Sequence, residues 1–234
     1  MKKLKRFIYL LLDRFCPMFL HRRLGYSQEG EDLVVASFFE GKENYKGFFV
    51  DVGAHHPYRF SNTAFFYKQG WRGINIEPTP SLFKPFLKFR KRDINLNYGI
   101  GNGETLTFYV FNEGAINTFD EHLAKERDGS HNGKYKIVDK IPIKTMPLSD
   151  ILDRHLPQNT KIDLLTIDVE GMDYLVLQSN DWSKYTPDFI LVECEESISN
   201  LSNDCIYQFL HAKGYSLVGR TKRTSLFRRN KDIL

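Results

Sequence analysis

Cysteine is scarce in this sequence and occurs in no metal-binding or redox pattern. The three cysteines, Cys16, Cys194 and Cys205, stand far apart in a chain of 234 residues. An odd number at such spacing provides neither a disulfide framework nor a Cys-x-x-Cys pair. We therefore expect a reducing compartment and three structural cysteines, with Cys194 buried in an apolar strand.

Long hydrophobic runs are also absent. The apolar run from Phe7 to Leu12 ends at Asp13 and Arg14, whereas a membrane-spanning helix needs about 20 apolar residues. No small-residue cleavage site follows the run, so it does not predict a signal peptide. Residues 1–25 predict a basic amphipathic helix, which either lies in an anionic membrane surface or packs its apolar face on the rest of the chain. We expect a cytoplasmic protein, and the first arrangement would place it peripherally on the inner face of the membrane.

The middle of the chain is short of positive charge. The net charge is +4, yet residues 1–23 carry +6 and residues 220–234 carry +5, which leaves −7 for the residues between them. A nucleic-acid-binding core would carry basic residues over one face of the folded body. We therefore expect no nucleic-acid partner. A hydrophobic fraction of 41% is sufficient for a sizeable globular core.

From Gly47 onward, short apolar segments alternate with helix-like segments, which is typical of a parallel sheet covered by helices. The last two extended segments are close enough to form an antiparallel hairpin. We predict a single doubly wound α/β domain over residues 26–234, with about seven strands. The expected extended segments are 47–53, 73–78, 93–101, 104–111, 140–148, 162–171, 188–195, 215–219 and 224–229.

A long polar connection separates the predicted strands 104–111 and 140–148. Connections of this length inside a compact domain are usually functional loops or mobile segments. We therefore expect it to be either a lid or substrate loop or a mobile segment.

Two neighbouring strand ends predict a site for an adenosine ligand. The first strand ends in Asp51-Val52-Gly53-Ala54, and the next ends in Glu77. Gly53 permits a sharp turn and the close approach of a ligand, and Glu77 can accept hydrogen bonds from a ribose diol. A tight turn in a purely structural domain would explain the same strand end equally well.

The glycine fingerprint G-x-G-x-x-G of dinucleotide-binding proteins is missing after this strand. A pyrophosphate would therefore lack the glycines that allow its close approach. A methionine group demands less of the loop, because its ammonium can pair with Asp51 or Asp168 and its carboxylate with loop amides.

These residues lie in blocks that resemble the FkbM-type methyltransferases. The likeness extends from Tyr26 to about Gly219, through YSQEGEDLVV, FVDVGAHHPYRFSNT, GWRGINIEPTPSLF, DINLNYGIG and IDLLTIDVEGMDYLVL. The resemblance implies a Rossmann-like methyltransferase sheet, S-adenosylmethionine as cofactor and transfer of a methyl group to a hydroxyl oxygen. It also implies an acceptor on a sugar, in a polysaccharide, glycolipid or secondary metabolite.

The resemblance also implies roles for single residues. It puts Asp51, Gly53 and Ala54 at the methionine end of the cofactor, Glu77 at the ribose, Gly99 and Ile100 near the adenine, and Ser27, Gln28 and Asp32 on a segment that folds over the cofactor. The sequence differs from the common pattern at Pro57, where many members have glycine.

Catalysis needs a base that takes the proton of the acceptor hydroxyl. The candidates are Asp168 and Glu170 from the last resembling block, and His55 or His56 beside the methionine site. The two carboxylates could instead hold a divalent metal. A further alternative is that Asp168 pairs with the cofactor ammonium and Glu170 caps the following helix.

Two other functions compete with a methyltransferase acting on a small-molecule or glycan acceptor. An NAD(P)-dependent sugar-modifying enzyme would use a similar sheet, but the glycine fingerprint and a Tyr-x-x-x-Lys pair are both missing. A non-catalytic, membrane-associated scaffold would account for the basic ends of the chain but not for the acidic strand ends.

Overall fold

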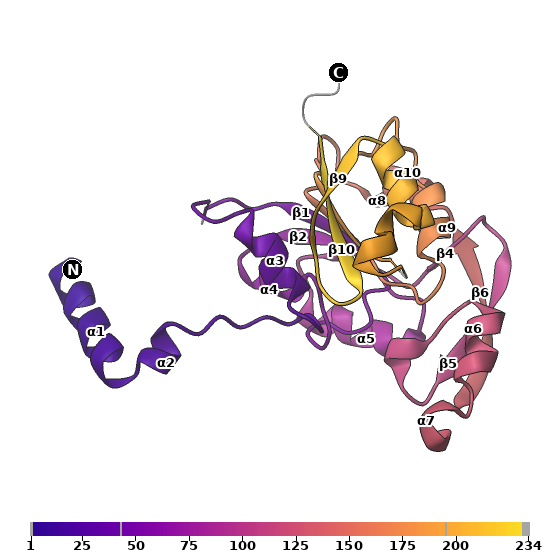
Figure 1. Ribbon diagram of the computed structural model, residues 1–234, viewed down its shortest axis with the longest axis horizontal. Coiled ribbons are helices and arrows are strands. Elements are labelled where there is room, and N and C mark those ends of the chain that lie inside the picture. The colour runs from indigo at the N-terminus through magenta and orange to yellow at the C-terminus, as the bar shows by residue number, and fades with distance from the viewer. Residues whose placement is uncertain (1, 43, 195, 231–234) are drawn as a thin grey trace.

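The computed structural model describes residues 2–42, 44–194 and 196–230. Its centre is a seven-stranded sheet, seen with its two covering layers of helices in Figure 1. The strands of this sheet, in chain order, are β1 (Phe48–Val52), β2 (Arg72–Ile76), β3 (Ile94–Leu96), β7 (Leu164–Ile167), β8 (Phe189–Glu193), β9 (Tyr215–Arg220) and β10 (Thr224–Arg229).

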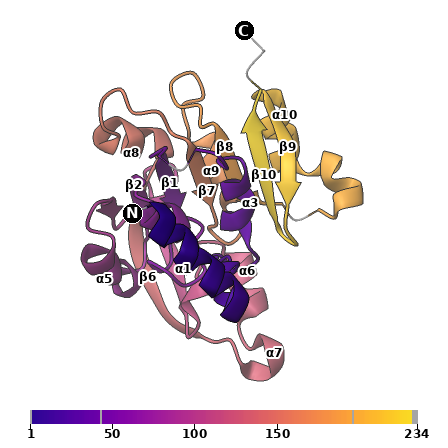
Figure 2. The same cartoon turned by 90° about the vertical axis from the view of Figure 1, so that its left-hand side faces the viewer.

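The order of these strands across the sheet is β3-β2-β1-β7-β8-β10-β9. The first five run parallel, and β10 runs antiparallel to both β8 and β9. The hairpin of β9 and β10 forms one edge of the sheet (Figure 2). This arrangement confirms the predicted Rossmann-like, mostly parallel sheet with an antiparallel C-terminal hairpin.

Helices cover both faces of the sheet because side chains alternate between the faces along each strand. Val50 and Val52 of β1 belong to the apolar core that includes residues of α8 (Leu148–His155), α9 (Asp173–Gln178) and α10 (Cys205–Ala212). Phe49 belongs to the opposite core, which includes residues of α3 (Glu31–Ser37) and α4 (Ala64–Lys68), together with Trp71. Cys194 is buried in the first core, and none of the three cysteines, all of which lie in the described ranges, forms a disulfide.

A second sheet of three strands lies beside the first, in the order β4-β6-β5. It consists of β4 (Gly99–Ile100), β5 (Thr105–Phe111) and β6 (Ile137–Met146). The predicted strand 93–101 is therefore wrong as one unit, since it divides into β3 and β4. The Asn97 side chain donates hydrogen bonds to the carbonyls of Glu77 and Pro78 at this point, and the chain leaves the main sheet there.

The long polar connection between β5 and β6 is largely ordered into short helices. These are η1 (Gly114–Ile116), α6 (Glu121–Arg127) and α7 (Ser130–Gly133). Asp120 caps α6, because its carboxylate accepts a hydrogen bond from the amide of Leu123. The other connecting helices are α5 (Pro80–Phe89), which begins with proline at its first position, and η2 (Ile198–Asn203).

The N-terminal helices α1 (Lys2–Phe15) and α2 (Pro17–Leu20) stand apart from the sheet and its helices (Figure 1). Of the two arrangements expected for this segment, packing of the apolar face on the domain is therefore the one that the structure does not show. Phe7 and Phe15 are 60% and 70% exposed, respectively. Within the described ranges, no helix combines the length and apolar character that crossing a membrane would require.

Candidate functional site

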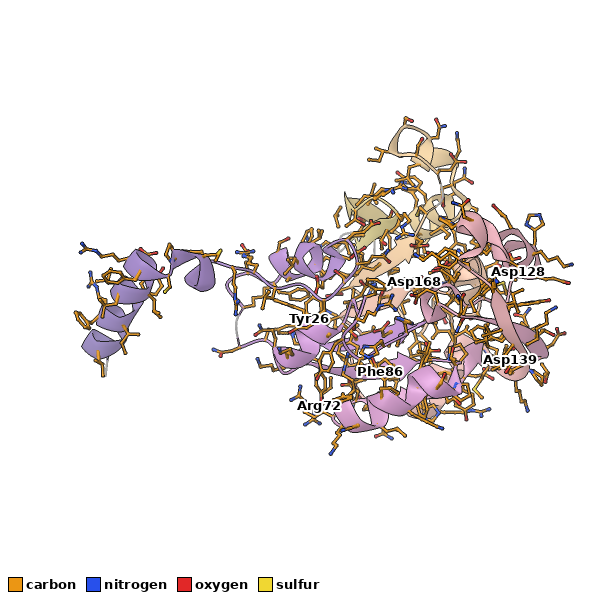
Figure 3. All side chains as sticks on the ribbon, turned by 90° about the horizontal axis from the view of Figure 1, so that it is seen from below. Tyr26, Arg72, Phe86, Asp128, Asp139 and Asp168 are labelled. Carbon is orange, nitrogen blue, oxygen red and sulfur yellow. The ribbon has the colours of Figure 1, made fainter. Side chains whose placement is uncertain are left out.

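The site lies where the direction of strand addition reverses. From β1 the chain first adds β2 and β3 on one side, and later returns to add β7 and β8 on the other. Ligands of open α/β sheets bind at such a switch point, outside the carboxyl ends of the strands. A cavity of about 900 Å³, its open mouth included, lies there between the ends of β1, β2 and β7. Asp168, directly after β7, is partly buried and lines this cavity (labelled in Figure 3).

Gly53 brings the ends of β1 and β7 together. Its φ of +80° is in the left-handed region, and a Cβ placed on it would lie 1.8 Å from the Asp168 carbonyl oxygen. No side chain can fit at that distance, so the two strand ends can approach this closely only with glycine at position 53. The turn and the cavity floor therefore depend on this residue.

Glu77 lies in the cavity wall at the end of β2, with its two carboxylate oxygens held by backbone amides. One oxygen accepts a hydrogen bond from the amide of His55 at 2.8 Å, and the other from the amide of Thr79 at 2.7 Å. Burial is the main cause that raises the pKa of Glu77 to about 7. The carboxylate is fixed in place and keeps lone pairs for a ligand.

Asp51 is held from behind by a buried network. The Thr63 hydroxyl donates to its Oδ2 at 2.6 Å, and the guanidinium of Arg90 donates to that hydroxyl at 3.0 Å. Arg90 is fully buried and pairs with Asp93 at 2.8 Å. Burial nevertheless dominates and raises the pKa of Asp51 to about 6.

Asp168 and Glu170 occupy different surroundings although both line the cavity. Among the described residues, no group donates a hydrogen bond to the Asp168 carboxylate. Burial, followed by the charges of Glu193 and Glu170, raises its pKa well above the usual range. The Glu170 carboxylate forms an ion pair with Arg127 of α6.

The backbone after β7 explains why Glu170 turns toward α6. Glu170 and Gly171 both have positive φ values, of 54° and 98°, so the chain makes a tight left-handed turn there. The Thr118 hydroxyl donates to the carbonyl of Glu170 at 2.7 Å. Helix α9 has Met172 at its N-cap without a side-chain hydrogen bond, so the alternative of Glu170 as its cap is wrong.

The loop amides after β1 are already engaged. Those of Gly53 and Ala54 donate to the carbonyl of Ile76 at 3.0 and 3.1 Å, and that of His55 donates to Glu77. The expected contact of these amides with a methionine carboxylate therefore has no free donor. The side-chain amides of Gln28 and Asn62 also line the cavity, and an NH₂ group has two donors.

A mostly apolar wall closes the other side of the cavity. Ile100 of β4, Phe108 of β5, Tyr98 and Phe119 line it. Gly114, Ala115 and Asn117 reach the same cavity from the long connection after β5. The smaller sheet and its connection therefore complete the site that the main sheet begins.

The two histidines after β1 have different places. His56 does not line the cavity, because its Nδ1 accepts hydrogen bonds from the amides of Tyr58 and Arg59 at 3.1 and 2.9 Å. His55 does line it, with the guanidinium of Arg59 3.1 Å from its Nε2. A guanidinium only donates, so Nε2 is the acceptor and the proton of the neutral ring is on Nδ1. Burial lowers the pKa of His55 to about 4, in agreement with a neutral ring.

The structure brings most of the predicted cofactor residues into one cavity. These are Gln28, Asp51, Gly53, Ala54, Glu77, Ile100 and Asp168, together with Glu170. Ser27 and Asp32 lie behind the cavity, where the buried Asp32 carboxylate accepts hydrogen bonds from Ser27 and the amide of Tyr26. Pro57 is buried, and its carbonyl accepts a hydrogen bond from Arg90 at 3.2 Å.

Within the part of the chain that the structure describes, no group of three or more His, Cys, Asp or Glu side chains could hold a metal ion.

The sequence profile of the Methyltransferase FkbM domain matches residues 51–217. The methyltransferase FkbM from Methylobacillus flagellatus KT is similar in structure, with a TM-score of 0.45 and 16% identity over 79% of this chain and 44% of that chain. This chain thus spans less than half of the length of that protein. Precorrin-6y C5,15-methyltransferase from Geobacter metallireducens GS-15 has a TM-score of 0.41 and 13% identity, over 89% of this chain and 93% of that chain. No curated protein matches the sequence.

Proposed function

The chain belongs to the FkbM methyltransferase family, and on this premise we propose that it is an S-adenosylmethionine-dependent O-methyltransferase. The cofactor would lie in the cavity at the ends of β1, β2 and β7. When bound, it supplies an activated methyl group on a sulfonium. The acceptor would be a sugar hydroxyl of a polysaccharide, glycolipid or secondary metabolite, which is the acceptor class that the resemblance to the family implies.

One observation carries this proposal: three carboxylates, Asp51, Glu77 and Asp168, line a single cavity. Burial is the largest cause that raises the pKa of each of them. Carboxylates in such a state are stabilised by a bound cation, because an opposite charge favours their ionised form. S-adenosylmethionine carries an ammonium and a sulfonium, whereas the pyrophosphate of NAD(P) would bring negative charge to the same place. The cavity therefore favours the methyl donor over the dinucleotide.

Different residues would contact different parts of the cofactor. Glu77 would accept hydrogen bonds from the ribose diol, and Asp51 would face the ammonium. Gln28 and Asn62 would donate to the methionine carboxylate, since the amides of Gly53, Ala54 and His55 are engaged; Asn62 would use the hydrogen that it does not donate to Thr166. Tyr98, Ile100 and Phe108 form the apolar wall that suits an adenine ring.

We propose that Asp168 is the general base that takes the proton of the acceptor hydroxyl. A general base needs an available lone pair and a raised pKa. Asp168 has both, because no described residue donates to its carboxylate and its pKa is raised. Glu170 is the weaker candidate for this role because Arg127 already pairs with its carboxylate. Its ion pair with Arg127 would instead hold the turn after β7 and helix α6 together beside the acceptor.

Calorimetry with S-adenosylmethionine, S-adenosylhomocysteine and NAD tests the cofactor assignment. We expect binding of both adenosyl ligands and no measurable binding of NAD. Binding of NAD alone would favour the sugar-modifying oxidoreductase, and binding of none would favour the scaffold. Transfer of a labelled methyl group from the cofactor to glycans of a cell lysate, followed by linkage analysis, then tests the acceptor class.

A further inference from the structure

Helix α1 presents an apolar surface that the rest of the described chain leaves uncovered. Leu4, Phe7, Leu11 and Phe15 are 64%, 60%, 41% and 70% exposed. Figure 1 shows α1 as a separate rod to one side of the sheet, and Figure 2, in which that side faces the viewer, shows it in front of the domain. Residues with this exposure normally occur singly on a folded surface, whereas here they share one helix.

Four of the exposed apolar residues form one continuous stripe. Leu4, Phe7, Leu11 and Phe15 follow at intervals of three or four residues, which places them along one side of a helix. By the same spacing Arg6 falls on the opposite side of the helix, whereas Arg14, seven residues after Phe7, lies at the edge of the stripe, from which a long arginine side chain can reach the headgroups. The one acidic residue of the helix, Asp13, is engaged by His21, whose Nε2 lies 2.6 Å from the carboxylate.

The length and charge of the segment indicate which surface the stripe fits. Helix α1 has 14 residues and is therefore about 21 Å long, whereas the apolar core of a bilayer is about 30 Å thick. It can lie in a membrane surface but cannot cross it. Residues 1–23 carry a net charge of +6, which complements anionic lipid headgroups. A second copy of the same helix would carry the same positive charge, so the two copies would repel each other.

The chain that follows α1 leads directly to the cavity. Tyr26, at the point where the linker joins the domain (Figure 3), accepts a hydrogen bond from the amide of Ser61. Two residues later, Gln28 lines the cavity mouth. Gln28 is eight positions after Leu20, the last residue of α2, which limits the distance between them to about 28 Å when the chain is fully extended.

From these observations we infer that α1 lies in the surface of an anionic membrane, with its apolar stripe among the acyl chains, and holds the cavity within reach of that surface. Arg6 and Arg14 lie at the level of the headgroups. The groove beside the linker is lined by Arg22, Arg23, Lys42 and Lys68, together with Glu40, which pairs with Arg23. The bound protein meets its acceptor at the membrane, whichever reaction the cavity performs.

Co-sedimentation of the full chain with vesicles tests this inference. We expect binding to vesicles of phosphatidylglycerol and phosphatidylcholine, and much weaker binding to phosphatidylcholine alone. Binding should fall as salt rises from about 0.1 M to 1 M, because the Debye length shortens from about 10 Å to 3 Å. Leu11→Glu should reduce the partition coefficient about tenfold or more, because it puts a charge into the apolar stripe.

Ile198→Glu is the matched control, because Ile198 is 77% exposed on the domain and receives the same charge away from α1. It should bind vesicles as the parent does. The affinity of both variants for S-adenosylmethionine should equal that of the parent, so that a failure to fold is recognised. Equal vesicle binding by Leu11→Glu and the parent would overturn the inference. So would sedimentation of the lipid-free parent as a dimer that Leu11→Glu dissociates, because the stripe would then be covered by a second copy.

Discussion

The buried carboxylates of the site destabilise the folded chain when no cation is bound beside them. Asp51 illustrates this, because it has the Thr63 hydroxyl and the nearby Arg90 charge as compensation, yet burial still raises its pKa to about 6. A carboxyl group whose pKa is higher in the folded than in the unfolded state favours folding when protonated. Its contribution is present below about pH 4 and is lost as the pH rises through about 6.

Asp51→Asn should therefore stabilise the free protein at pH 8 and leave it unchanged at pH 4. The amide resembles the protonated acid, and a shift of about two pKa units corresponds to roughly 2–3 kcal/mol in the free energy of unfolding. Urea denaturation at both pH values, followed by circular dichroism, measures this difference. The same substitution should weaken binding of S-adenosylmethionine. A variant that is less stable than the parent at pH 8 would show that the Thr63 and Arg90 contacts outweigh burial.

Asp168→Asn and Glu170→Gln should separate the two carboxylates after β7. Loss of a general base typically lowers the rate by about 10²–10⁴-fold. We expect this for Asp168→Asn, with a smaller effect for Glu170→Gln, whose side chain would still accept a hydrogen bond from Arg127. Single-turnover methyl transfer at saturating cofactor measures both. The opposite order of the two rates would assign the base to Glu170.

At the scale of elements, the site depends on how closely the ends of β1 and β7 approach. Gly53→Ala would place a Cβ 1.8 Å from the carbonyl of Asp168, while Gly103→Ala, at a similar φ of +87°, would meet nothing within 4 Å. The second substitution thus isolates the cost of the backbone conformation, about 1 kcal/mol. We expect Gly53→Ala to lower the free energy of unfolding by several kcal/mol and to weaken cofactor binding. Similar losses for the two variants, measured by thermal unfolding and calorimetry, would show that the strand ends adapt.

The elements of the main sheet could be predicted because each carries its own local signal. The apolar segments that became β1, β7 and β8 are bounded by turn residues, and the acidic residues Asp51, Glu77 and Asp168 stand at or just after strand ends. Parallel strands bring their carboxyl ends to one edge, so these side chains were expected together. The separation of β5 and β6 into a second sheet had no such signal, since an extended segment does not specify its partner.

Contacts between distant segments could not be predicted for the same reason. Arg127 and Glu170 are 43 residues apart, and Arg127 lies in a connection that the sequence marks only as polar. The different positions of His55 and His56 depend on a turn in which two amides donate hydrogen bonds to the His56 ring. Neighbouring residues of one type are equivalent in a sequence until such a turn orients them.

The whole molecule combines an acidic cavity with a basic, exposed helix. The first 23 residues carry a net charge of +6, residues 24–219 carry −7, and residues 220–234, which include β10, carry +5. The acidic cavity suits a cationic cofactor, and the basic helix suits an anionic surface. The cavity and helix α1 are spatially separate, so a substitution can impair either one without changing the other.

The most direct test of the account is the affinity for S-adenosylmethionine of Glu77→Ala compared with Asp163→Ala. Both residues are 4% exposed, but Asp163 lies at the amino end of β7, away from the cavity. Loss of a charged acceptor for a ribose diol costs roughly 1.5–3 kcal/mol, so calorimetry should show a dissociation constant raised about 10-fold to 150-fold for Glu77→Ala. It should show the parent value for Asp163→Ala. An unchanged dissociation constant for Glu77→Ala would contradict the assignment of this cavity to the cofactor.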